Sequence, residues 1–113
     1  MVTKLEKIEN RRKEIIEEIS RIESMRKGSL NEQFLKVPQK GKEPILRGPY
    51  YVLTRKENNK TKSSRINKGQ YEETKEEIEN YKYFINLSTE YAQITEELTD
   101  MKKRVRSEDS KKN

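Results

Sequence analysis

Apolar residues in the second half of the chain recur at steps of three and four, and this spacing is the strongest constraint on the fold. The stripe consists of Thr74, Ile78, Tyr81, Phe84, Leu87, Tyr91, Ile94, Leu98, Met101 and Val105. Such steps place side chains on one face of an α-helix. Asn67 and Gln70 have the spacing of a helix cap. We therefore predict a long helix over residues 68–106. The run of three-residue steps from Ile78 to Leu87 predicts local overwinding or a wedged neighbouring element.

A shorter stripe opens the chain. Its heptad positions are Leu5, Ile8, Arg12, Ile15, Ile19, Ile22 and Arg26. Thr3 and Glu6 have capping-box spacing, and Gly28 suits a left-handed stop, so we predict a helix over residues 3–27. Only 29% of the chain is hydrophobic and 41% is charged, which favours a narrow seam over a globular core. These features predict a mainly α fold, an antiparallel two-helix coiled coil with an inserted basic β-hairpin. We expect a single elongated domain over residues 1–106 and a disordered tail over 107–113.

The segment between the helices has a different character. Residues 28–48 contain two prolines and are predicted to form an irregular connector. Residues 49–66 alternate as a hairpin, with a type I′ turn at Asn58-Asn59. That register places Tyr51 opposite Ile66 and Leu53 opposite Ser64, on the face that we expect to pack on the helices. The other face carries Tyr50, Val52, Thr54, Lys56, Thr61, Ser63 and Arg65.

Positive charge is concentrated in the middle of the chain. Residues 35–68 hold ten basic and two acidic side chains, a net +8 in a protein of net charge +6. Segregated charge of this kind indicates a polyanionic partner, although lysines that only solvate a linker would look the same. The predicted nucleic-acid-binding residues are Arg47, Tyr50, Thr54, Arg55, Lys56, Lys60, Lys62, Ser63, Arg65 and Lys68. Lys56, Lys60, Lys62 and Arg65 are expected to line one ridge of the hairpin. Tyr50 is placed to stack on a base.

Several function classes are excluded or disfavoured. The chain has no cysteine and no histidine, which removes thiol nucleophiles, imidazole bases and thiolate metal sites. We predict no enzymatic activity, no cofactor and no metal. No apolar run approaches the roughly 20 residues of a membrane span, and the charged N-terminus has no signal-peptide pattern. We expect a cytoplasmic protein that does not associate with membranes.

An ordered set of short motifs carries a resemblance. These are "MRKGSL" at 25–30, "GPYY" at 48–51, "SSRI" at 63–66 and "IENYKYFINLSTEYAQITEEL" at 78–98. In this order the chain resembles a family of short, uncharacterised bacterial proteins associated with transposases and other mobile elements. The resemblance covers about residues 5–100. It implies an accessory role near nucleic acid and brings no catalytic residue with it.

These observations predict a non-enzymatic accessory protein of a mobile element that binds DNA or RNA through its basic hairpin. We also expect a homodimer formed through the helical seam, and a transposase or other mobile-element protein is a further candidate partner. The alternative is a coiled-coil adaptor between proteins, or a self-assembling structural protein, that binds no nucleic acid. In that case the basic segment would only keep the loop soluble.

Overall fold

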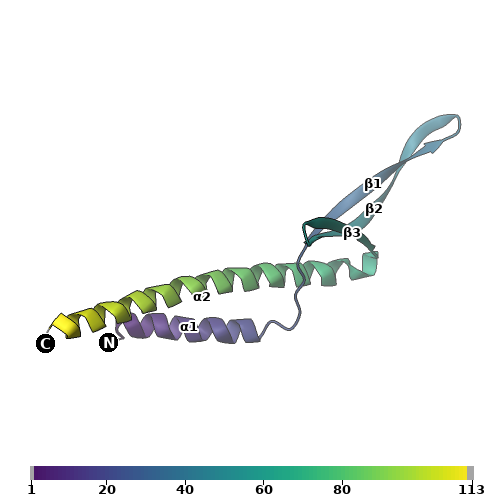
Figure 1. Ribbon diagram of the computed structural model, residues 1–113. Coiled ribbons are helices and arrows are strands. Elements are labelled where there is room, and N and C mark those ends of the chain that lie inside the picture. The colour runs from purple at the N-terminus through teal and green to yellow at the C-terminus, as the bar shows by residue number, and fades with distance from the viewer. Residues whose placement is uncertain (1, 112–113) are drawn as a thin grey trace. The chain divides into compact units, whose positions relative to one another are not determined.

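The computed structural model describes the backbone of residues 2–111 and the side chains of residues 2–107. Its elements are α1 (Lys4–Ser20), β1 (Ser29–Gln39), β2 (Lys42–Glu57), β3 (Lys60–Ile66), the short 3-10 helix η1 (Lys68–Gln70) and α2 (Tyr71–Lys111) (Figure 1). They divide into two compact units. Unit 1 combines the chain up to Glu23 with the chain from Lys82 onward, and unit 2 is Ser24–Tyr81. Helix α2 therefore contributes to both units.

The predicted fold class, a mainly α coiled coil, is wrong. The three strands form one antiparallel sheet in the order β1-β2-β3, so the protein is an α+β structure of two helices and a three-stranded sheet. The predicted hairpin is only part of this sheet. β1, with 11 residues, and the first part of β2, with 16, occupy the segment 28–48 that was expected to be irregular.

Two β-bulges explain how a segment rich in proline forms a ladder. The pairing of β1 with β2 shifts twice, and at each shift β2 has one residue more than β1. Pro49 lies within the first shift, and Pro38 and Pro44 lie within the second. Proline lacks the N–H that a regular ladder requires, and bulges are among the few places in a sheet that accept it. At the first bulge Gly48 has a φ angle of 141°, and a Cβ there would lie 2.8 Å from the Gln33 carbonyl oxygen.

The predicted hairpin between β2 and β3 is confirmed in detail. Tyr51 pairs with Ile66 and Leu53 pairs with Ser64, as the alternation predicted. Asn58 and Asn59 have φ angles of 50° and 65°, the positive values that a type I′ turn requires. The tight asparagine turn and the period of two in the strands together determine the register.

One face of the sheet packs on the first turns of α2, as predicted for the face of Tyr51. The Tyr51 and Tyr71 rings have centroids 4.3 Å apart. We call the face of Tyr51 and Leu53 the packed face, and the face of Tyr50, Val52 and Thr54 the open face. Val52, Leu53, Thr74 and Ile78 are the buried side chains of unit 2.

Helix α1 ends at Ser20, seven residues earlier than predicted. The following linker lies against α2, where the Arg26 backbone N–H donates to the Glu77 carbonyl at 3.0 Å. The Asn80 side-chain amide donates to the Ser24 carbonyl at 2.9 Å. These bonds replace the helical bonds that the apolar spacing alone would favour. Tertiary contacts thus override the local pattern here.

The start of α1 and the start of the second helical segment follow the predicted caps. The Thr3 hydroxyl accepts a hydrogen bond from the Glu6 N–H at 3.1 Å. Asn67 and Gln70 form a capping box, although the first turn after it is η1 rather than α-helix. α2 continues to Lys111, through part of the segment 107–113 that was predicted to be disordered. Residues 112 and 113 lie outside the described residues.

Unit 1 is an antiparallel pairing of α1 with the later turns of α2. Ile15, Leu87 and Leu98 are its buried apolar side chains, with 0%, 3% and 2% exposure. The predicted stripe along α2 is buried or half-buried in both units except at Val105, which is 58% exposed. Two pairs define the antiparallel direction, because Lys4 lies 3.5 Å from Glu97 while the later Arg11 contacts the earlier Glu90.

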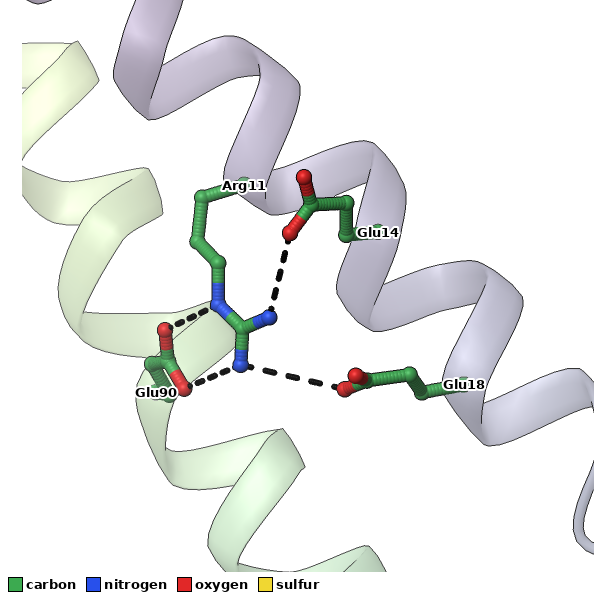
Figure 2. A network of polar contacts seen from close by, with 4 residues as sticks. All are labelled: Arg11, Glu14, Glu18 and Glu90. Carbon is green, nitrogen blue, oxygen red and sulfur yellow. Dashed lines mark hydrogen bonds and ion pairs between the residues drawn. The ribbon is translucent and has the colours of Figure 1, made fainter.

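Arg11 is the centre of the polar network in unit 1 (Figure 2). Its Nε and Nη2 atoms donate to the two oxygens of Glu90 at 2.6 and 2.8 Å, a bidentate pair. Its guanidinium also lies 3.3 Å from Glu14 and 3.7 Å from Glu18. The hydrogen bonds from Arg11 lower the pKa of Glu90 below its ordinary value, against a smaller opposing effect of burial. The pair links α1 to α2 across the seam.

Gly28 is predicted to contribute to the stability of unit 2. Its φ angle is 147°, and a Cβ there would lie 3.0 Å from both the Leu53 Cδ1 atom and the Thr54 carbonyl oxygen. We expect Gly28→Ala to lower the free energy of unfolding by about 1–3 kcal/mol, because an L-residue is strained at this angle. Gly69→Ala, where nothing lies within 4 Å, is the matched control and is expected to change stability little. Urea denaturation of both variants measures their free energies of unfolding. Equal losses of stability in the two variants would contradict this role of Gly28.

Glu90 is predicted to make stability depend on acid pH. Because the pKa of Glu90 lies below its ordinary value of 4.5 in the folded protein, its pairing stabilises the fold above that pH. The contribution is lost as pH falls through the lowered pKa. We expect Glu90→Gln to have a lower melting temperature than the wild type at pH 6. The difference between the two melting temperatures should be smaller at pH 3. Glu96→Gln, an exposed change on the same helix, provides the control. A gap that stays constant with pH would refute this role.

Candidate nucleic-acid interface

All ten residues predicted to bind nucleic acid lie in unit 2, but they do not form one surface. Alternation along β2 and its pairing with β3 place Tyr50, Thr54, Lys56, Ser63 and Arg65 on the open face. The same pairing places Arg55, Lys60 and Lys62 on the packed face. Arg47 lies where β2 pairs with β1 alone, and Lys68 lies in η1.

The expected single ridge of Lys56, Lys60, Lys62 and Arg65 is therefore wrong. Side chains alternate between the two faces of a strand, and residues paired across strands share a face. Lys56 pairs with Thr61 and Arg65 with Val52, whereas Lys60 pairs with Glu57 and Lys62 with Arg55. Two of the four basic residues thus lie on each face.

The open face is built around Tyr50 and Val52. The Arg65 guanidinium lies over the Tyr50 ring, 4.1 Å from its centroid, which is a cation–π contact. The Thr54 and Ser63 hydroxyls lie 3.2 Å apart across the two strands. Val52, on the same face, is only 7% exposed. A base that stacked on the occupied side of Tyr50 would have to displace Arg65.

The basic residues on the packed face are partly neutralised. Glu57 forms ion pairs with both Arg55 and Lys62, the second at 2.9 Å. A hollow of about 420 Å³ lies beside them, lined by Arg26, Leu53, Arg55, Lys62, Ser63 and Ser64. Arg26 is in turn 3.5 Å from Glu77. Each cationic side chain at this hollow therefore has a carboxylate close to it.

The first part of β2 extends beyond β3 and pairs only with β1. β3 pairing begins at Tyr51, whereas β1 pairs with β2 as far as the turn at Lys40-Gly41 (Figure 1). We call residues 34–47 the ribbon arm. Its basic residues are Lys36, Lys40, Lys42 and Arg47, and its only acidic residue is Glu43. All five are exposed.

The ribbon arm also exposes large apolar side chains. Phe34, Leu35, Ile45 and Leu46 are 55%, 43%, 39% and 65% exposed. Cross-strand pairs put Leu35 beside Arg47 on one face of the arm and Lys36 beside Leu46 on the other. Apolar and basic side chains are thus interleaved on both faces.

Three exposed lysines of the ribbon arm, Lys36, Lys40 and Lys42, were not among the predicted site residues. They lie in the segment 28–48, which was predicted to be an irregular connector without strand faces. Their signal was present in the charge count for residues 35–68, in which they supply three of the ten basic side chains.

Most of this basic segment has no acidic partner. Of the ten basic side chains between Lys36 and Lys68, only Arg55 and Lys62 have a carboxylate within 4.0 Å among the residues that the structure describes. All ten are exposed. The unpaired positive charge of unit 2 therefore faces solvent on the ribbon arm, on the open face and along β3.

Metal sites and membrane spans are not found in the described part of the chain. Within residues 2–111, no cluster of three or more potential histidine, cysteine, aspartate or glutamate ligands is arranged to hold a metal ion. No described helix combines the length and the apolar character needed to cross a membrane.

Comparison with known families places the chain in one of them. A family model described as a domain of unknown function (DUF6788) matches residues 5–76. This match covers more than half of the chain, from α1 through the sheet to the first turns of α2, and the protein belongs to that family. No curated protein and no solved structure matches the chain.

Proposed function

We propose that this protein binds nucleic acid without catalysis, through the basic surface of unit 2. The observation that carries the proposal is the exposed and largely unpaired charge of that unit. Eight of its ten basic side chains between Lys36 and Lys68 have no ion-pair partner among the described residues. Binding a polyanion would give these charges partners and release counterions.

The strand architecture supports the same proposal. β-Ribbons of DNA-binding proteins place their strands in the major or the minor groove of duplex DNA. Thr61 and Ser63 are exposed, and their hydroxyls can donate to phosphate oxygens beside the lysines of β2 and β3. These contacts fix position and affinity but carry no sequence information.

The accessory role for a mobile element is proposed from the resemblance of the ordered motifs between Met25 and Leu98. Such a protein would hold nucleic acid for a transposase or a related enzyme, which would supply the chemistry. The absence of histidine and cysteine from the chain agrees with a binding role, because neither an imidazole base nor a thiolate is present.

A second candidate function is contact with another protein through unit 1. Ile16, Tyr83 and Ile85 are 51%, 45% and 41% exposed there. The pairing of Arg11 with Glu90 and of Lys4 with Glu97 places residue 16 of α1 near the level of residue 85 of α2. A second copy of the chain is one such partner, and the homodimer stays a prediction that sedimentation equilibrium tests.

Neutralising the basic surface of unit 2 is predicted to remove nucleic-acid binding. The test variant carries Lys40→Gln, Lys42→Gln, Lys56→Gln and Lys60→Gln, four exposed residues without ion pairs among the described residues. We expect affinity for labelled DNA and RNA to fall. The salt dependence on duplex DNA should flatten by about 0.9 for each phosphate that the variant no longer neutralises. Fluorescence anisotropy at several salt concentrations measures both quantities.

The matched control removes the same charge elsewhere. Lys7→Gln, Lys13→Gln, Lys75→Gln and Lys82→Gln change four exposed lysines outside the sheet. The proposal requires this control to bind nearly as well as the wild type. Equal losses in the two variants would show that net charge alone attracts the nucleic acid, and no binding by the wild type at low salt would overturn the proposal.

Removing the carboxylate of Glu57 is predicted to strengthen binding. Glu57→Gln frees both Arg55 and Lys62 from their ion pairs. We expect tighter binding and a salt slope on duplex DNA steeper by up to about 0.9 for each freed cation that reaches a phosphate. Glu96→Gln makes the same change in net charge at an exposed residue of α2, outside the sheet, and frees no ion pair among the described residues, so it is the control. Equal gains from both variants would contradict a specific effect of Glu57.

A further inference from the structure

The ribbon arm combines two properties that a purely electrostatic surface does not need. It exposes four large apolar side chains, Phe34, Leu35, Ile45 and Leu46, at 39–65% of their area. Exposed apolar clusters cost free energy in water and mark surfaces that contact a partner. The basic residues of the arm lie directly beside them, because Lys36 pairs with Leu46 and Arg47 pairs with Leu35.

We propose that the ribbon arm enters the minor groove of duplex DNA and wedges apolar side chains against the base steps, bending the duplex. This inference rests on the proposed function and specifies its ligand and its mode of contact. Proteins that enter the minor groove commonly insert Phe, Leu, Ile, Met or Pro between base steps and thereby kink the duplex. The arm presents several of these residue types, and its lysines are placed to contact the phosphates on each side.

The composition of the arm favours wedging over readout in the major groove. Bidentate readout of base edges is made by arginine or lysine on guanine and by asparagine or glutamine on adenine. Residues 34–47 contain five side chains of these types, Lys36, Gln39, Lys40, Lys42 and Arg47, and seven large apolar residues and prolines, Phe34, Leu35, Val37, Pro38, Pro44, Ile45 and Leu46. The side chains suited to wedging between base steps are therefore the more numerous set.

The geometry of the arm is also suited to a groove. Each of its strands has about six residues beyond the first bulge, which at ~3.3 Å per residue extends roughly 20 Å. β3 does not pair with this part of β2, and every residue of the arm is exposed except the half-buried Val37, so both faces of the arm are accessible. The second bulge, with Pro38 and Pro44, lies next to the turn, where it increases the local twist of the ribbon.

The first experiment uses the unmodified protein. A duplex of about three helical turns carries a fluorescent donor and acceptor at its two ends, and energy transfer is followed as protein is added. We expect transfer to rise on binding, since bending shortens the end-to-end distance. A duplex that binds without a change in transfer would overturn the wedge and leave the proposed function standing. Tighter binding to single-stranded DNA or RNA than to duplex would have the same consequence. No binding to any nucleic acid would end both proposals.

A pair of variants then tests the apolar side chains. The double variant Ile45→Ser, Leu46→Ser should abolish most of the bending. It should also bind the duplex roughly tenfold more weakly, which is comparable to the effect of one mismatched base pair on a specific protein–DNA complex. Its salt slope should remain that of the wild type, because no charge is removed. Val2→Ser with Val105→Ser removes two exposed apolar side chains from unit 1, 53% and 58% exposed, and should leave bending unchanged. Circular dichroism confirms that each variant is folded, and full bending by the folded arm variant would refute the wedge.

Discussion

The pairing of β2 on both sides is the interaction on which unit 2 depends. Its central residues Val52 and Leu53 are buried because β1 and β3 flank them, and Tyr51 beside them contacts the ring of Tyr71. A two-stranded ribbon alone is marginal in water, so the third strand and α2 provide the stability that the arm lacks. The arm exists because β3 has only seven residues against the sixteen of β2.

The two units use their charges in opposite ways. In unit 1 the Arg11 guanidinium contacts three carboxylates, of which Glu90 lies on the facing helix, so charge serves to hold α1 on α2. In unit 2 only Glu57 among the acidic residues of the three strands forms ion pairs within the described residues. The other basic side chains of the strands face solvent, and self-repulsion among them is tolerable because solvent screens exposed charges.

Local patterns predicted the parts of the fold that local interactions determine, such as the β2–β3 register at Asn58-Asn59 and the caps at Thr3 and Asn67. The end of α1 could not be predicted in this way, because it depends on hydrogen bonds from the linker to Glu77 and Asn80. β1 was missed because proline normally argues against a strand, whereas here each proline falls at a bulge. A bulge is defined by both strands, and the pattern of one strand does not reveal it.

The candidate site shows the same limit at the level of side chains. The ten basic residues between Lys36 and Lys68 correctly predicted a segment of positive charge. Their arrangement was not predicted, because alternate side chains of a strand point to opposite faces, which puts Lys56 and Arg65 on one face and Lys60 and Lys62 on the other. β3 is an edge strand, so its basic side chains on both faces remain exposed. The basic side chains consequently lie on both faces of the sheet beside its β3 edge, and further ones lie on the ribbon arm.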